Sequence, residues 1–281
     1  MWYNNFKGDA AWMAQVYTSA TWRRLFPDPF YIFQVSHLSA VNVDPDELHI
    51  LHLGCSMYFR GSVLWLLCYE VGRDTPEENM HNVWVAIAKE YRNTQAACQF
   101  SNLGLSSVCN KDKPRAHFPK LKGKGAEVKD LALPLSKVWG RMKTNAQMHN
   151  GEAKTFKALI GIQTILHSHA QHALLPTGIA GKLDDLVQSF LQEYTILANS
   201  VDKAQKLLFS MTPKFHYMWH LGKRAIYLNP RKGNTMMDED FVGRCKDIVA
   251  ACASGTEAHR VPAKVSERYS WGKYILEEYG L

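Results

Sequence analysis

Residues 41–67 read VNVDPDELHILHLGCSMYFRGSVLWLL, and this stretch decides how the chain folds. From Asp46 to about Gly72 no proline interrupts the chain, and apolar residues recur at helical spacing. Asp44 or Asp46 precedes this run, and aspartate is a preferred residue at the N-cap of a helix. The sequence therefore predicts a long apolar helix that begins near Asp46.

The rest of the chain is predicted to be mainly α-helical. Aromatic and β-branched residues before Asp46 favour one or two short strands, at Tyr31–Phe33 and Ala40–Val43, and glycines, prolines and lysines favour a loop over residues 101–125. Further helical patterns cover residues 9–26, 75–100, 126–147, 152–174, 180–210, 213–226, 238–253 and 261–278. We expect a helical bundle-like body with a small β element near residues 30–45.

The predicted organisation is a single domain over residues 1–281, because no linker or repeat divides the pattern. Within it, residues 28–147 carry a basic loop at 105–125, and residues 148–281 form a helical C-terminal region.

Composition places the chain among folded soluble proteins. Hydrophobic residues make up 46% and charged residues 21%, which argues against disorder. The longest apolar run, Val63–Tyr69, is too short for a bilayer, which needs about 20 residues. We see no signal peptide pattern and no C-x-x-C pair among the six cysteines. We expect reduced thiols and a nuclear or cytoplasmic protein that is neither secreted nor transmembrane.

Asp46 and His49 form the motif with the clearest chemical meaning. Residues three apart share a helix face, so the carboxylate could face a metal ion and the imidazole a phosphate or water. The structural alternative is that Asp46 caps the helix and His49 packs beneath it. Spacing alone leaves both interpretations open.

Positive charge is concentrated in the loop before residue 130. The chain carries a net charge of +7, which makes an anionic partner plausible. The loop cations are Lys111, Lys113, Arg115, Lys120, Lys122 and Lys124, and a second cluster holds Lys223, Arg224, Arg231 and Lys232. Both clusters are predicted to contact the DNA backbone, and the alternative is a solvated surface.

Histidines and tryptophans in the helical patterns are predicted to have structural roles. His216 and His220 lie at positions i and i+4 among core-like residues, so packing and hydrogen bonding are favoured over a metal site. The histidines of LHSHAQH, residues 166–172, fall on two helix faces and are expected at the surface. The tryptophans are expected to anchor the core: Trp65, Trp84, Trp139, Trp219 and Trp271.

Three stretches resemble CACTA-like and related eukaryotic DDE transposases. Asp46-Glu47-Leu48-His49 with Leu53-Gly54 resembles their D-x-M-H-x-x-x-L-G segment. LKGKGAEVKDLALPLSKVW, residues 121–139, resembles the segment with the last catalytic acid, which would be Glu127. TPKFHYMWHL, residues 212–221, resembles the P-K-x-H-x-x-x-H stretch. The resemblance runs in order over about residues 28–270.

The resemblance implies a partial ribonuclease-H-like core with a helical insertion, and Mg²⁺-dependent DNA strand cleavage and transfer. Asp46, His49 and Glu127 would be the catalytic positions, with Asp46 and Glu127 as metal ligands. Such an enzyme also needs acids on strands before the D-x-x-H segment, and Asp9 and Asp28 do not fit them. The chain therefore resembles the C-terminal part of a transposase, and the resemblance implies strand transfer only if a partner chain, a homo-oligomer or a lost N-terminal segment supplied the missing acids.

Two rival interpretations remain from the sequence. One is a co-opted, non-catalytic binding module with the same helical body. The other is a helical protein-interaction scaffold whose charge serves solubility.

Overall fold

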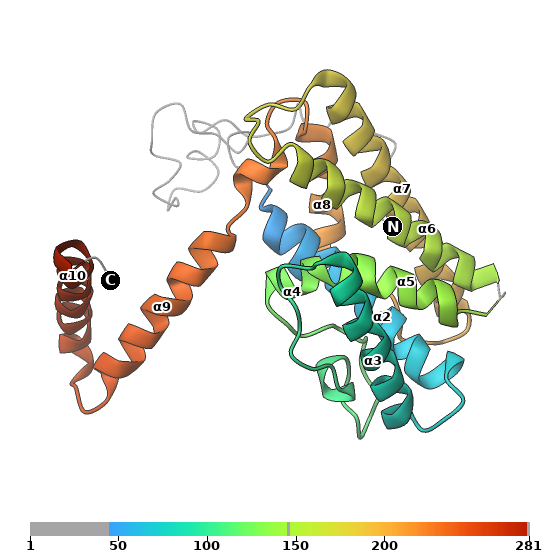
Figure 1. Ribbon diagram of the computed structural model, residues 1–281, viewed down its shortest axis with the longest axis horizontal. Helices are drawn as coiled ribbons and strands as arrows, with labels where there is room; N and C mark the ends of the chain where they lie inside the picture. Colours follow the sequence, from blue (N-terminus) through green and yellow to red (C-terminus); the bar gives the residue numbers. More distant parts are fainter. Residues whose placement is uncertain (1–44, 145–146, 280–281) are drawn as a thin grey trace, which may run out of the picture. The chain divides into compact units, whose positions relative to one another are not determined.

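The computed structural model describes residues 45–144 and 147–279 (Figure 1). These residues contain helices and no strand, which confirms the mainly α-helical prediction. The α-helices are α2 (Met57–Leu66), α3 (Pro76–Thr94), α4 (Gly125–Asp130), α5 (Ala132–Met142), α6 (Gln147–Ser168), α7 (Thr177–Lys203), α8 (Pro213–Arg224), α9 (Met236–Ala253) and α10 (Val261–Tyr279). Short π-helical or 3₁₀ segments are η5 (Leu48–Ser56), η6 (Leu67–Val71), η7 (Leu105–Ser107), η8 (Pro230–Gly233) and η9 (Ala258–Arg260).

The predicted β element gains no support. Its strands, Tyr31–Phe33 and Ala40–Val43, lie outside the described residues. The part of the chain that the structure describes supplies no strand to a ribonuclease-H-like sheet.

The chain divides into two compact units, Met1–Asn234 and Thr235–Leu281. In the first unit α6 packs along α7, α8 packs on α7 and η5, and α3 packs on α5 and η6. In the second unit α9 packs on α10, and Phe241 meets Tyr269 edge to face with ring centroids 6.0 Å apart. The single domain predicted for residues 1–281 stays a prediction.

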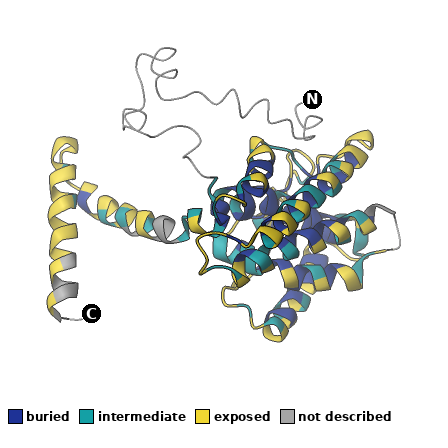
Figure 2. Cartoon of the chain, turned by 90° about the horizontal axis from the view of Figure 1, so that it is seen from above, coloured by how far each residue is buried: buried dark blue, intermediate teal, exposed yellow. Residues whose placement is uncertain are grey.

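A nearly continuous helical segment, Leu48–Val71, runs through the core of the first unit. It comprises η5, α2 and η6, and it confirms the long helix predicted from residue 46 onward. The segment is long and apolar enough to cross a membrane, but 89% of its most apolar window is buried inside the fold. Figure 2 shows buried residues gathered between the helices of this unit. A soluble protein is compatible with that burial.

Gly54 interrupts the regular geometry of this segment. A Cβ at this position would lie 2.7 Å from the His49 carbonyl oxygen and 2.9 Å from Lys214 Cδ, so the close approach requires glycine. Leu53 and Gly54 have non-helical backbone angles, and Lys214 Nζ donates a hydrogen bond to the Leu53 carbonyl at 2.7 Å. The kink thereby joins the start of the core helix to α8.

Phe59 lies at the centre of the core. Its ring contacts four other aromatic rings, from α6, α7 and the segment before α8: Phe156, Phe190, Tyr194 and Phe209. Tyr194 keeps its hydroxyl satisfied by donating to the Ser210 carbonyl at 2.8 Å. The core is therefore assembled around α2 from segments far away in the sequence.

Predicted helix starts are more accurate than predicted ends. Thr75 forms the expected N-terminal cap of α3, with Glu78 completing a capping box. The helix ends at Thr94 rather than near Phe100, because Gln95 adopts a left-handed conformation at the C-cap. The core role predicted for Trp271 is wrong, because this residue is 59% exposed on α10.

Candidate functional site

Asp46 caps the helix start, as the structural alternative predicts, and it also contacts His49. Asp46 Oδ1 accepts a hydrogen bond from the Leu48 N–H at 2.8 Å, which satisfies a free donor at the helix start. Asp46 Oδ2 contacts His49 Nδ1, so the two side chains share a face. The His49 side chain is 43% exposed and is not packed beneath the helix.

Glu127 lies in the first turn of α4. Its Oε2 accepts a hydrogen bond from the Lys124 N–H at 2.8 Å, which makes it a capping residue as well. A Cβ at Gly125 would collide with Leu48, so the start of α4 lies directly on η5. No cluster of three or more histidine, cysteine, aspartate or glutamate side chains suited to a metal occurs among the described residues. The Mg²⁺ site at Asp46 and Glu127 stays a prediction.

The basic loop is held against the core helix through its backbone. Trp65 Nε1 donates to the Pro114 carbonyl at 3.1 Å. Three main-chain hydrogen bonds anchor its second half: Lys120 N–H to Val108 O at 2.9 Å, Leu121 N–H to Met57 O at 3.1 Å, and Lys122 N–H to Ser107 O at 2.8 Å. The loop therefore has a defined path although it has little regular structure.

The predicted DNA-contacting side chains of this loop all reach the surface. Six cations are exposed, and none pairs with a carboxylate of the described residues: Lys111, Lys113, Arg115, Lys120, Lys122 and Lys124. We call this set the loop cations.

The second predicted cluster is different, because two of its members neutralise acidic groups of the protein. Lys223 Nζ lies 2.8 Å from Asp184 Oδ2, and Arg231 Nη1 lies 3.2 Å from Glu47 Oε2. DNA contact by Lys223, Arg224, Arg231 and Lys232 stays a prediction.

Glu47 is the centre of a buried polar network that the sequence motif did not reveal. Its side chain is 3% exposed. Oε1 lies 3.1 Å from His52 Nε2, and Oε2 accepts from Arg231 Nη1 at 3.2 Å and Asn234 Nδ2 at 3.1 Å. His52 Nδ1 lies 3.5 Å from Gln163 Nε2. The network joins η5, α6 and η8.

The pKa shifts assign the charges in this network. Burial alone would raise the pKa of Glu47, but hydrogen bonding and attraction from His52 and Arg231 outweigh it, so the pKa is lowered. Burial lowers the pKa of His52, and this effect exceeds the attraction of Glu47. At neutral pH Glu47 is therefore ionised and His52 neutral, so His52 donates from Nε2 and accepts at Nδ1 from Gln163.

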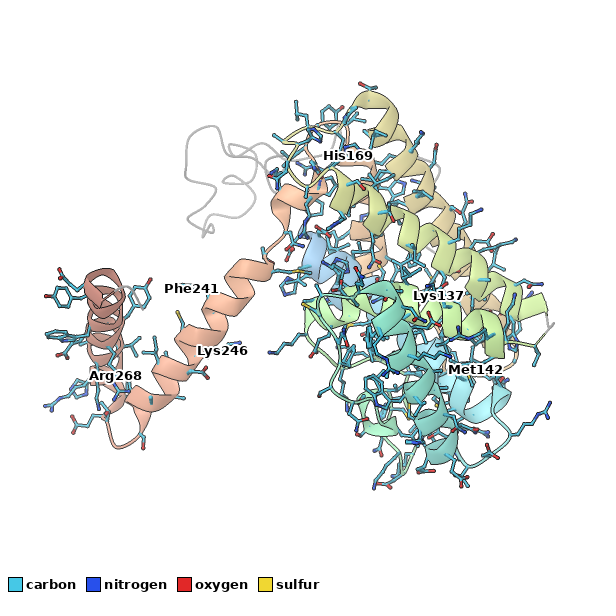
Figure 3. All side chains as sticks on the ribbon, in the orientation of Figure 1. Lys137, Met142, His169, Phe241, Lys246 and Arg268 are labelled. Carbon is cyan, nitrogen blue, oxygen red and sulfur yellow. The ribbon has the colours of Figure 1, made fainter. Side chains whose placement is uncertain are left out.

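Asn229 fixes the position of Arg231. Its amide donates to the carbonyls of His169 and His172, each at 2.8 Å, and its Oδ1 accepts from the Arg231 N–H at 3.1 Å. His169, labelled in Figure 3, follows the end of α6. The sequence predicts these histidines at the surface. In the network they contribute only their backbone carbonyls, which accept the hydrogen bonds from Asn229.

A cavity of about 510 Å³ lies beside this network. Glu47, His52, Gln163 and Arg231 supply polar groups to its wall. The remaining wall comes from the end of α3, from α4 and α5, and from α6: Thr94, Gln95, Ala96, Ala97, Lys129, Asp130, Ala132, Leu133, Pro134, Ile160, Thr164, Leu166 and His167. Its size and mixed lining suit a small ligand.

The sequence did carry one signal for this network. Glu47 and His52 are polar residues inside an apolar stretch, and residues five apart lie on one face of a π-helix. An α-helical interpretation puts them on different faces, which is why their pairing was missed. Arg231 could not be linked to them, because it lies far along the chain.

No protein-family model matches this chain, and no curated protein or solved structure matches it significantly.

Replacing Glu47 with glutamine should lower the free energy of unfolding by about 2–4 kcal/mol, because Arg231 would be left without its buried counter-charge. Urea unfolding of the purified chain measures the change. Glu70→Gln is the matched control, since Glu70 forms a more exposed pair with Lys206 at 2.6 Å. The control should cost less than about 1 kcal/mol. Equal losses in both variants would contradict a central role for Glu47.

Stability should fall as pH drops below about 6.5, because unfolded His52 then binds a proton that the folded residue resists. Glu47 adds to the fall below about 4.5, where the unfolded carboxylate protonates first. Protonation of His52 alone can lower the free energy of unfolding by at most about 1.4 kcal/mol per pH unit. Urea unfolding at several pH values measures this effect. The difference in free energy of unfolding between wild type and His52→Gln should narrow as pH falls. A constant gap would contradict the assignment of a neutral His52.

Proposed function

We propose that this protein is a transposase-derived DNA-binding protein whose loop cations contact the DNA phosphate backbone. One observation carries the proposal: six exposed cations between residues 111 and 124 have no carboxylate partner among the described residues. Exposed cations that no carboxylate of the described residues neutralises are available to replace the counterions of DNA.

The anchoring of the loop strengthens this interpretation. Because its backbone is bonded to the core helix at Met57, the loop loses little conformational freedom when it binds a ligand. Contacts to phosphates carry no sequence information, so this surface would bind duplexes of many sequences. The net charge of +7 of the whole chain also favours binding to an anionic partner such as DNA.

The resemblance to DDE transposases supplies the finer part of the proposal. The loop leads directly into α4, which carries Glu127, and α4 packs against η5 beside the Asp46–His49 turn. In this proposal the region is a remnant of an Mg²⁺-dependent strand-transfer enzyme. The remaining acids would come from a partner chain or a second copy, and the protein would be nuclear or cytoplasmic.

A second candidate function is a protein-interaction scaffold. It is favoured by aromatic residues on α10, where Tyr269, Trp271 and Tyr274 are 45%, 59% and 53% exposed. Exposed aromatic residues are common in protein interfaces. This function and DNA binding use different units of the chain.

We expect purified protein to bind duplex DNA, with an affinity that falls steeply as salt rises. Replacing Lys120, Lys122 and Lys124 with alanine should reduce the slope of log affinity against log salt by about 0.9 for each phosphate that is no longer neutralised. Fluorescence anisotropy with a labelled duplex at several salt concentrations measures both quantities.

The matched control replaces Lys157, Lys182 and Lys203 with alanine. These lysines are exposed on α6 and α7, so the control removes the same charge from another surface. It should change the slope much less than the loop variant. The proposal is overturned if wild type shows no salt-dependent affinity, or if both triple variants weaken binding equally.

Asp46→Asn and Glu127→Gln should each leave duplex affinity within about twofold of wild type, because neither residue belongs to the loop cations. We also expect no nicking of supercoiled plasmid in Mg²⁺ by the isolated chain, because Asp9 and Asp28 do not fit the strand-borne acids that such an enzyme needs. Gel electrophoresis of the plasmid measures nicking. Mg²⁺-dependent nicking that disappears in both variants would instead establish a complete enzyme.

A further inference from the structure

A second cavity, of about 340 Å³, lies between α3 and the segment that leads into the basic loop. The residues of α3 that line it are spaced three and four apart, so they share one face of the helix: Glu77, Met80, His81 and Trp84. The rest of the wall comes from residues 102–106 and from Lys111. Its volume lies within the range of small-ligand pockets, about 300–1,000 Å³.

Trp84 gives this cavity an aromatic wall. Its side chain is partly exposed, and it packs against the hydrophobic core. The ring meets the buried ring of Tyr91 edge to face, with centroids 6.3 Å apart, so it is held in place from the core side. Met80, Leu103 and Leu105 are buried and supply apolar surface to the same cavity. A fixed aromatic ring beside apolar side chains suits a flat aromatic group such as a nucleobase.

Two of the loop cations lie at the same cavity. Lys111 lines it and is exposed. Lys122 Nζ donates to the carbonyl of Ser106 at 2.9 Å, and Ser106 lines the cavity. That bond uses one of the three N–H donors of the ammonium group. Glu77 contributes one carboxylate to the wall, so two positive charges stand against one negative charge and an anionic group is favoured.

Polar groups that could pair with the edge of a base are also present. Asn102 and Ser106 line the cavity and are exposed. An amide both donates and accepts hydrogen bonds, and so does a hydroxyl. The cavity therefore combines an aromatic face, cations and neutral polar groups, which match the base, the phosphate and the base edge of one nucleotide.

We propose that this cavity holds one unpaired nucleotide of a single-stranded DNA segment, with its base against Trp84 and its phosphate at Lys111 and Lys122. The proposal rests on the DNA binding inferred above, and it names the form of DNA that this part of the surface accepts. Bases inside a duplex are paired and stacked, so they enter a pocket only after unpairing, which costs free energy. A single-stranded tail presents its bases without that cost.

Fluorescence anisotropy with three labelled ligands tests the proposal: a blunt duplex, the same duplex with a single-stranded thymidine tail, and the same duplex with an abasic tail. The abasic tail carries the same phosphates and no bases, so the two tails are matched in charge. The thymidine-tailed duplex should bind at least about fivefold more tightly than the abasic-tailed duplex, because a base stacked on an aromatic ring stabilises the complex by that much or more.

The three ligands also separate this inference from the proposed function. Salt-dependent binding of the blunt duplex with equal affinities for the two tails would overturn this inference alone. Binding to none of the three ligands would overturn the proposed DNA binding as well.

Trp84→Leu provides the sharper test, because it removes the aromatic ring and keeps an apolar side chain against the core. It should weaken binding of the thymidine-tailed duplex about 5- to 100-fold. Affinity for the blunt duplex should stay within about twofold of wild type, because the loop cations are unchanged. The matched control is Trp271→Leu, which removes a 59% exposed tryptophan from α10 and should leave the preference between tails intact. A preference that survives in Trp84→Leu would contradict the proposal.

A second variant keeps the test decisive if Trp84→Leu does not fold. Gly104 lines the cavity, and a Cβ at this position would have only Ser106 Oγ near it, at 4.0 Å. Its backbone is extended, with φ −119° and ψ 172°, so Gly104→Leu should narrow the cavity without strain. Loss of the preference for the thymidine tail with an unchanged midpoint of urea unfolding supports the proposal. An unchanged preference in this variant would place the base outside the cavity.

Discussion

The buried carboxylate of Glu47 is the constraint on which the first unit depends. It joins the start of the core helix to Arg231 and Asn234, which lie 184 and 187 residues later in the chain. A buried carboxylate is tolerated only when hydrogen bonds and an opposite charge compensate for lost hydration. That requirement fixes His52 as a neutral donor, places Arg231 at the cavity and holds η8 against α6. The same residues supply the polar part of the cavity wall.

The π-helical geometry of η5 makes this arrangement available. It places Glu47 and His52 on one face although they are five residues apart. Gly54 then kinks this segment, with a close approach to His49 and Lys214 that no larger residue allows. Irregular helical geometry and a dense polar network occur together here, as they often do at functional sites. Residues 46–52 thus carry both the Asp46–His49 turn and two residues of the cavity wall, Glu47 and His52.

Local patterns predicted the helices well and the site only in part. The uninterrupted apolar run after Asp46 predicted the core helix, and Thr75 with Glu78 predicted the start of α3. Both predictions succeeded because each signal is local in the sequence. Asp46 caps the helix as one alternative predicts, but His49 is exposed instead of packed beneath it, and the metal-facing role stays a prediction. Glu47 was missed because Arg231 and Asn234 lie far along the chain and because α-helical spacing separates Glu47 from His52. The exposure of Trp271 was missed because helical spacing does not reveal whether a neighbouring element covers a face. The prediction of DNA contact by the loop cations rests on their charge and on their position just before Glu127, both of which the sequence shows directly.

The way in which the basic loop is attached has a consequence for its history. Each anchoring bond uses a main-chain group of the loop, from the Pro114 carbonyl to the N–H groups of Lys120, Leu121 and Lys122. A side chain replaced at positions 111, 113 or 115 leaves all of these bonds in place. The surface chemistry of the loop is therefore separable from the stability of the scaffold. Selection could increase, redistribute or erase the charge of this surface by single substitutions, while the same helical body persisted beneath it.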